Sequence, residues 1–196
     1  MTKAIDGLIA FGRASTEFES RLRLVAADDW TRPTPCTEWD VYALVNHVIG
    51  GNRRYTTLLH GALTQAVSRT RTEDHLGDDP IGSFAVTAGE LSAAFREPDA
   101  MTRTAHHPLG DRSGAELLGM RVIDLTVHAW DLARALGTDD TLDPEAVTYA
   151  LVNSESIERG RKHGSFAKPT AALPSQASAQ ARLLHLSGRS IEGDRW

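Results

Sequence analysis

Asp124 and His128 are the residues whose types and spacing most directly suggest metal chemistry in this chain. They lie four residues apart in the segment 119–131, GMRVIDLTVHAWD, where most of the flanking residues are apolar. Residues four apart on a helix lie on one face, about one turn from each other. A carboxylate and an imidazole on one face can hold a divalent cation together. The spacing therefore predicts two metal ligands that point into a helix bundle.

A third ligand is expected from His47, which lies in the similarly apolar segment 41–49, VYALVNHVI. If the two helices pack, the three side chains converge and leave a coordination position open, as a catalytic site requires. Nitrogen and carboxylate ligands suit zinc and nickel, which are the ions we expect. Asp131 continues the face of Asp124 and His128, and it is expected to hold the far ring nitrogen of a ligating histidine.

The same three residues also have an interpretation without metal. Asp124 and His128 alone would form an intrahelical ion pair, which contributes a few tenths of a kcal/mol. His47 would then be a core histidine bonded to a backbone carbonyl. The spacing of Asp124 and His128 does not by itself decide between a metal site and an ion pair.

A pair of glycines beside His47 favours a functional site. Gly50 and Gly51 follow His47 by about one turn, and each glycine inside a helix costs about 1 kcal/mol relative to alanine. We expect them to leave space for a water, a substrate or the close approach of a neighbouring helix. Arg54 lies on the His47 face and is the candidate for binding a substrate carboxylate, whereas Arg53 is expected at a solvated helix edge.

Length and composition restrict the class of protein. The chain has 196 residues, 41% of them hydrophobic, with a formal net charge of −5, and this suits one globular domain over residues 1–196. An acidic chain has no general attraction to nucleic acid or to anionic membranes. The single cysteine, Cys36, excludes an internal disulfide. No segment resembles a signal peptide or is long enough to span a bilayer, so we expect a cytoplasmic protein.

Hydrophobic spacing and capping residues predict an almost entirely helical chain. The expected helices cover about residues 3–28, 38–62, 83–96, 113–136, 144–157 and 178–187, with loops at 70–80 and 98–112. Thr37 is expected to cap the second of these helices, with Asp40 in its first turn. Ser113 with Glu116 forms a capping-box pattern, and Gly137 is expected to end that helix.

Three segments carry a resemblance to a known family. They are 34–41 (TPCTEWDV) continued through LVNHV and GGNRR to residue 54, then 124–135 (DLTVHAWDLARA), and 181–189 (ARLLHLSGR). The chain resembles the N-terminal metal-binding domain of mycothiol-dependent maleylpyruvate isomerases, and most of all the stand-alone actinobacterial branch of this DinB-like superfamily. The resemblance implies an all-α, DinB-like four-helix bundle with a long crossover connection. The bundle would cover about residues 3–160, and a C-terminal extension, 161–196, would carry a short helix.

The resemblance also implies a function. The family's metal, usually zinc or nickel, is bound at the positions of His47, Asp124 and His128, but the family usually has glutamate where this chain has Asp124. The shorter arm leaves open whether Asp124 ligates directly or through a water. The family's chemistry implies mycothiol, or another low-molecular-weight thiol, acting on a small electrophilic substrate by sulfur transfer or isomerisation.

Two further questions stay open in the sequence. The tail is too short for the C-terminal module of maleylpyruvate isomerases, so that exact activity is not expected. A non-catalytic binding or regulatory bundle with a weakened metal site is the alternative to an enzyme. The sequence does not decide between a monomer and a homodimer.

Other residues that could carry chemistry have simpler interpretations. Cys36 precedes a helix start, where a thiolate would be favoured, but such a cysteine is more often a small buried hydrophobe. His106 and His107 lie in an expected loop and are interpreted as solvated. Trp39 and Trp130 are expected to anchor the core.

Overall fold

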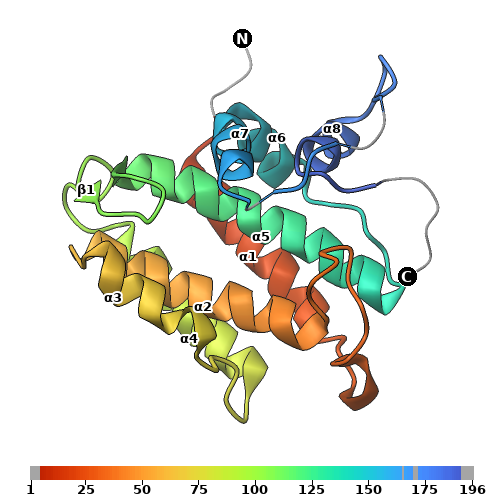
Figure 1. Cartoon of the computed structure of the whole chain (residues 1–196), viewed down its shortest axis with the longest axis horizontal. Coiled ribbons are helices and arrows are strands. Elements are labelled where there is room, and N and C mark those ends of the chain that lie inside the picture. Colours follow the sequence, from red (N-terminus) through yellow and green to blue (C-terminus); the bar gives the residue numbers. More distant parts are fainter. Residues whose placement is uncertain (1–4, 165, 170–171, 191–196) are drawn as a thin grey trace.

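The structure, a computed structural model, describes residues 5–164, 166–169 and 172–190. Its centre is a bundle of four long helices, as predicted (Figure 1). These are α1 (Gly7–Leu22), α2 (Val41–Leu59), α4 (Pro80–Ala94) and α5 (Gly114–Leu136). Because α1 and α2 each pack chiefly against α4 and α5, they occupy diagonal positions in the bundle. The connection 60–79 is the long crossover connection, because it runs back along α2: Asn46 Nδ2 donates to the Glu73 carbonyl, and Asn46 Oδ1 accepts from the His75 amide.

The start of α2 places His47, and it differs from the prediction. Asp40, not Thr37, is the N-cap, because its Oδ1 accepts a hydrogen bond from the Ala43 amide at 2.8 Å. Thr34 accounts for the difference: its amide and its hydroxyl both donate to the carbonyl of Trp39. These bonds hold the preceding residues in a turn, so the helix begins at Val41.

The start and end of α5 agree with the prediction. The hydroxyl of Ser113 accepts from the amide of Glu116, and the carboxylate of Glu116 accepts from the amide of Ser113. Gly137 follows the helix at φ 68°, a left-handed conformation that glycine adopts without a Cβ penalty. This helix of 23 residues carries Asp124, His128 and Asp131 in one unbroken run.

Several expected boundaries are wrong. The first helix ends at Leu22, and a separate 3₁₀ turn, Ala27–Asp29, follows where the Asp29 carboxylate accepts from the Ala26 amide. The helix expected from residue 83 begins at Pro80, because Asp79 caps it. The expected loop 70–80 opens with a 3₁₀ turn, Thr70–Thr72, directly after a short helix, α3 (Thr64–Arg69).

The helix expected over 144–157 is divided into α6 (Pro144–Val152) and α7 (Glu155–Lys162). Asn153 lies at the break, where its side-chain amide donates to the Tyr149 carbonyl. The same side chain fills the space beside Gly119 on α5. Asn153 therefore ends α6 and at the same time packs it onto the bundle.

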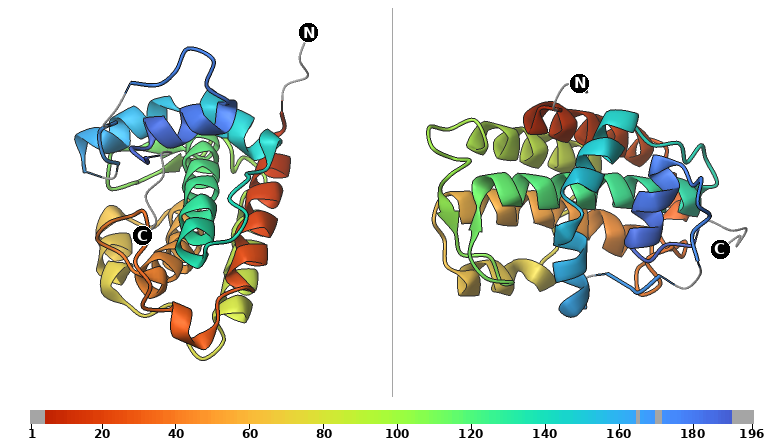
Figure 2. Two further views of the ribbon diagram at one scale, coloured as in Figure 1. Left: turned by 90° about the vertical axis from the view of Figure 1, so that its right-hand side faces the viewer. Right: turned by 90° about the horizontal axis from the view of Figure 1, so that it is seen from above.

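Two small features complete the part that positions the site. The connection expected to be irregular contains an antiparallel pair, β1 (Thr104–Ala105) and β2 (Arg112–Ser113), with Thr104 opposite Ser113. The helices α6, α7 and α8 (Ala179–Leu186) lie on the side of α5 away from α2 and α4 (Figures 1 and 2). Leu183 and Leu184 are buried where α8 packs against α6. No helix in the described residues is both long and apolar enough to cross a membrane.

Candidate metal centre

The structure brings His47, Asp124 and His128 together between α2 and α5. Asp124 Oδ1 lies 3.2 Å from His47 Nε2 and 3.4 Å from His128 Nε2. One potential ligand atom from each residue lies within 4.8 Å of the others. Zinc bonds of about 2.0–2.1 Å in tetrahedral geometry place ligand atoms about 3.3 Å apart. Two of the three separations match this spacing, so the three residues could hold a zinc-sized ion.

Asp131 contacts the ring of His128, and its role in supporting a metal ligand stays a prediction. The His128 Nδ1 lies 2.9 Å from Asp131 Oδ2, and the Asp131 side chain is fully buried. If Nδ1–H donates to this carboxylate, the lone pair of Nε2 is left for the site. The contact thus selects the tautomer of His128 that a metal ligand needs.

A residue that the sequence analysis missed holds Asp131 in turn. Arg189, just beyond α8, binds both oxygens of the Asp131 carboxylate, from Nη2 at 2.6 Å and from Nε at 3.1 Å. Arg189 is the last residue of the segment 181–189, which carries part of the family resemblance. That resemblance was the one feature of the sequence that could have pointed to Arg189. The end of the described chain therefore contributes to the orientation of His128.

Burial and neighbouring charges set the protonation states of these residues. Burial lowers the pKa of His47 to about 4, so this imidazole is neutral near pH 7. Burial alone would raise the pKa of Asp124, but at low pH the protonated rings of His47 and His128 outweigh it and hold this pKa well below its usual range. Burial would likewise lower the pKa of His128, but Asp124 and Asp131 raise it. The site thus contains two ionised carboxylates beside the imidazoles.

The other oxygen of Asp124 faces Arg121, which the sequence analysis did not single out. The Arg121 side chain is only 1% exposed, and its Nη1 donates to Asp124 Oδ2. Its Nη2 donates to the Val48 carbonyl at 2.7 Å and to Asn52 Oδ1 at 2.8 Å. The sequence could have indicated this pair, because Arg121 lies three residues before Asp124 and therefore on the same helix face.

The space beside the two glycines is filled by neighbouring side chains. A Cβ added at Gly51 would lie 2.6 Å from Arg121 Nη1, and one added at Gly50 would collide with the His75 ring. Of the three expected uses of that space, close approach of a neighbour is the one the structure displays. A role for Gly50 and Gly51 in binding substrate stays a prediction.

A cavity of about 270 Å³ lies beside His47. Its lining consists of Trp39, Tyr42, Ala43, Asn46, His47, Arg54, Arg71 and His75. Trp39 is half-buried and packs against the core, and its ring also lies against His47, with centroids 4.5 Å apart, and 5.6 Å from His128. Trp130 is buried in the core as expected. The cavity therefore has an aromatic wall beside the histidines and two arginines in its lining.

The remaining candidates lie outside the group of three. Cys36 is half-buried and not part of the buried core, and burial raises the pKa of its thiol to about 11, so a thiolate is not favoured there. His107 is not solvated, because it is 8% exposed and packs edge-on against Tyr55. His106 is exposed and pairs with Asp111 at 2.9 Å.

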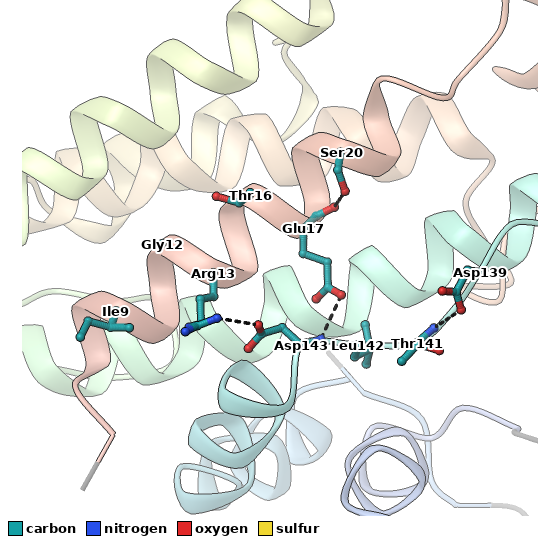
Figure 3. A pocket seen from close by; sticks show the side chains of 10 residues that line it. All are labelled: Ile9, Gly12, Arg13, Thr16, Glu17, Ser20, Asp139, Thr141, Leu142 and Asp143. Carbon is teal, nitrogen blue, oxygen red and sulfur yellow. Dashed lines mark hydrogen bonds and ion pairs between the residues drawn. The ribbon is translucent and has the colours of Figure 1, made fainter. Parts of the chain in front are cut away.

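A larger cavity, about 690 Å³, lies between α1 and the segment 139–143 (Figure 3). Arg13 pairs there with Asp143 at 3.2 Å, and Glu17 accepts from the Asp143 amide at 3.0 Å. These groups join α1 to the start of α6, and none of the three candidate ligands lines the cavity.

The fold and the site define an all-α, DinB-like bundle with a candidate three-ligand metal centre. Residues 11–133 match the family model described as the mycothiol maleylpyruvate isomerase N-terminal domain. The chain belongs to this family. Two relatives from Mycobacterium tuberculosis, uncharacterized protein MT0763 (strain CDC 1551 / Oshkosh) and uncharacterized protein Rv0738 (strain ATCC 25618 / H37Rv), are each 31% identical over 153 residues. The match covers 78% of this chain and 80% of each relative.

Two solved structures share the fold. The crystal structure of the mycothiol-dependent maleylpyruvate isomerase superposes with a TM-score of 0.67 at 17% identity, covering 95% of this chain and 90% of that one. A histidine-to-alanine mutant of that isomerase gives a TM-score of 0.65 at 16% identity, covering 97% and 95%. Both matches therefore span most of each chain.

Proposed function

We propose that this protein is a metal-dependent enzyme that uses a low-molecular-weight thiol to act on a small electrophilic substrate, by sulfur transfer or isomerisation. The observation that carries the proposal is the convergence of His47, Asp124 and His128 beside a cavity. Membership of a family described by its mycothiol dependence supports mycothiol as the thiol. Its location in the cytoplasm stays a prediction.

The metal and the surrounding residues would divide the work. Zinc or nickel would supply a Lewis-acidic centre able to hold a thiol as its thiolate, the form that attacks an electrophilic carbon. His47, Asp124 and His128 would bind the ion, and Asp131 would keep the His128 ring oriented. The Trp39 ring lies tilted against both histidine rings, at centroid distances of 4.5 and 5.6 Å, and would exclude water from that side.

The two arginines of the cavity support an acidic substrate. Arg54 is 8% exposed, and its Nη2 donates to the carbonyl of His47 at 3.2 Å. Arg71 is exposed at the same cavity. Within the described residues neither guanidinium forms an ion pair with a carboxylate. A carboxylate on the substrate would be placed beside His47 by these charges, since guanidinium groups bind carboxylates through paired hydrogen bonds.

Cobalt substitution tests the thiol step. Titration of the cobalt protein with mycothiol should produce an intense near-ultraviolet charge-transfer band, because a thiolate then ligates the ion. S-methylated mycothiol, which cannot form a thiolate, is the matched control and should leave the spectrum unchanged. A cobalt protein whose spectrum does not respond to mycothiol or simpler thiols would contradict the proposal.

A non-catalytic bundle with a weak metal site is the second candidate. It is favoured by the contacts of Asp124, because Oδ1 already lies near both histidines and Oδ2 already binds Arg121. The protein thus satisfies this carboxylate without an ion. Loss of zinc from the reconstituted protein on desalting, together with the absence of thiol binding, would favour this candidate over an enzyme.

A further inference from the structure

We infer that Arg121 is a positioning residue of the metal centre, which reserves Asp124 Oδ2 and presents Oδ1 alone as the ligand atom. The inference rests on the proposed metal site of His47, Asp124 and His128. In this arrangement Arg121, a buried arginine on α5, makes Asp124 ligate the ion through one oxygen.

The contacts of Asp124 divide cleanly between its two oxygens. Oδ1 faces the ring nitrogens of His47 and His128, at 3.2 and 3.4 Å. Oδ2 accepts from Arg121 Nη1 on the opposite side. Rotation of the carboxylate to offer both oxygens to one ion would break the bond to Arg121. Because that guanidinium is 1% exposed, water could not replace the lost partner.

Hydrogen bonds to α2 hold the Arg121 guanidinium in the position from which it binds Asp124. Its Nε and Nη2 donate to Asn52 Oδ1 at 3.0 and 2.8 Å, and Nη2 also reaches the Val48 carbonyl. Asn52 is oriented in turn by Thr87 of α4, whose Oγ1 lies 3.2 Å from Asn52 Nδ2. Three helices of the bundle thus fix one guanidinium group.

Gly51 makes room for the Arg121 guanidinium in this arrangement. The guanidinium of Arg121 passes so close to α2 that a Cβ at position 51 would lie 2.6 Å from Nη1. Glycine at this position therefore admits the arginine between α2 and α5. This accounts for a helical glycine that its intrinsic propensity disfavours.

The arrangement has a consequence for the metal. A carboxylate that ligates through one oxygen occupies one coordination position, whereas a carboxylate that chelates through two occupies more of the sphere. Reserving Oδ2 for Arg121 would keep positions open for a thiol and a substrate. The charge of Arg121 would also compensate the half-buried carboxylate of Asp124 while the ion is absent.

Cobalt binding by Arg121 variants tests the inference. Arg121→Met removes the hydrogen bond to Asp124 together with the positive charge. Arg121→Lys keeps the charge but lacks the planar guanidinium group that binds three partners at once. We expect Arg121→Met to bind cobalt about 10- to 100-fold more weakly, with Arg121→Lys between it and the wild type. The visible cobalt bands of Arg121→Met should also weaken as Oδ2 joins the coordination sphere. Arg21→Met, which removes another buried arginine from α1, is the control and should keep wild-type affinity and spectrum.

The outcomes separate this inference from the metal site itself. If the wild type binds no cobalt, the proposed metal centre fails, and this inference fails with it. If the wild type binds cobalt and folded Arg121→Lys and Arg121→Met bind it with the same affinity and spectrum, only the inference is overturned. Should Arg121→Met fail to fold by circular dichroism, Arg121→Lys decides. A wild-type affinity and spectrum in Arg121→Lys would then overturn the inference.

Discussion

At the scale of single residues, the site depends on where each oxygen and nitrogen atom points. His128 offers Nε2 because Asp131 engages Nδ1, and Asp124 offers Oδ1 because Arg121 engages Oδ2. The sequence alone suggested that the aspartate was a shortened, weaker version of the family's glutamate. The contact with Arg121 indicates instead that the surroundings fit the shorter arm.

This difference leads to a prediction for Asp124→Glu. The added methylene would push the carboxylate out of its place between Arg121 and the two histidines. We expect zinc affinity, measured by competition with a chromophoric chelator, to fall about tenfold or more. Asp124→Ala gives the zinc affinity that remains when the carboxylate is absent. Zinc binding by Asp124→Glu equal to or tighter than that of the wild type would mean that the short arm is a defect.

The candidate ligands could be predicted from the sequence, but most of their supports could not. Asp124, His128 and Asp131 share one helix, so spacing alone relates them. Arg189 reaches Asp131 from 58 residues away, and Asn52 reaches Arg121 from 69 residues away. Local periodicity contains no information about such pairs. They depend on how α2, α5 and the segment after α8 pack.

At the scale of the helices, a glycine on one helix makes room for a side chain of a neighbouring helix. Gly51 is the clearest case, since Arg121 occupies the place of its missing side chain. The sequence correctly marked Gly50 and Gly51 as exceptional, because helix propensity disfavours them. It could not show that His75 and Arg121 fill the space.

Gly51→Ala and Gly89→Ala make a matched pair of tests. Gly89 lies on the exposed side of α4, and a Cβ added there meets nothing within 4 Å. Gly89→Ala should raise the free energy of unfolding by up to about 1 kcal/mol. Gly51→Ala should lower the melting temperature and weaken zinc binding, because it displaces Arg121. Equal stability and equal zinc binding in the two variants would contradict this account.

The segment after α8 is predicted to support the site through Arg189. Arg189→Ala would leave the fully buried Asp131 carboxylate without its guanidinium, which typically costs about 3–5 kcal/mol. Urea denaturation measures this loss. Arg159→Ala, which breaks an exposed pair with Glu116, is the control and should cost less than about 1 kcal/mol. An Arg189→Ala protein as stable as the control would show that this ion pair does not support the site.

At the scale of the whole molecule, hydrophobic periodicity was enough to predict an almost entirely helical chain, but not how its outer layer packs. The boundaries were wrong where a side chain competes with the helix, as Asn153 does between α6 and α7. The packing of α6, α7 and α8 over α5 and α1 depends on contacts between distant segments. The family resemblance predicted the crossover connection, which local sequence patterns do not determine.

The central claim is that this bundle binds one divalent ion between α2 and α5. The most direct test is the zinc content of tag-free protein after reconstitution and desalting, for the wild type, His47→Ala, His128→Ala and His60→Ala. His60 is exposed and pairs with Glu97, so it controls for the loss of a histidine. We predict one zinc per chain in the wild type and in His60→Ala, and none in the other two variants. Equal zinc content in all four proteins, or none in any of them, would contradict the account.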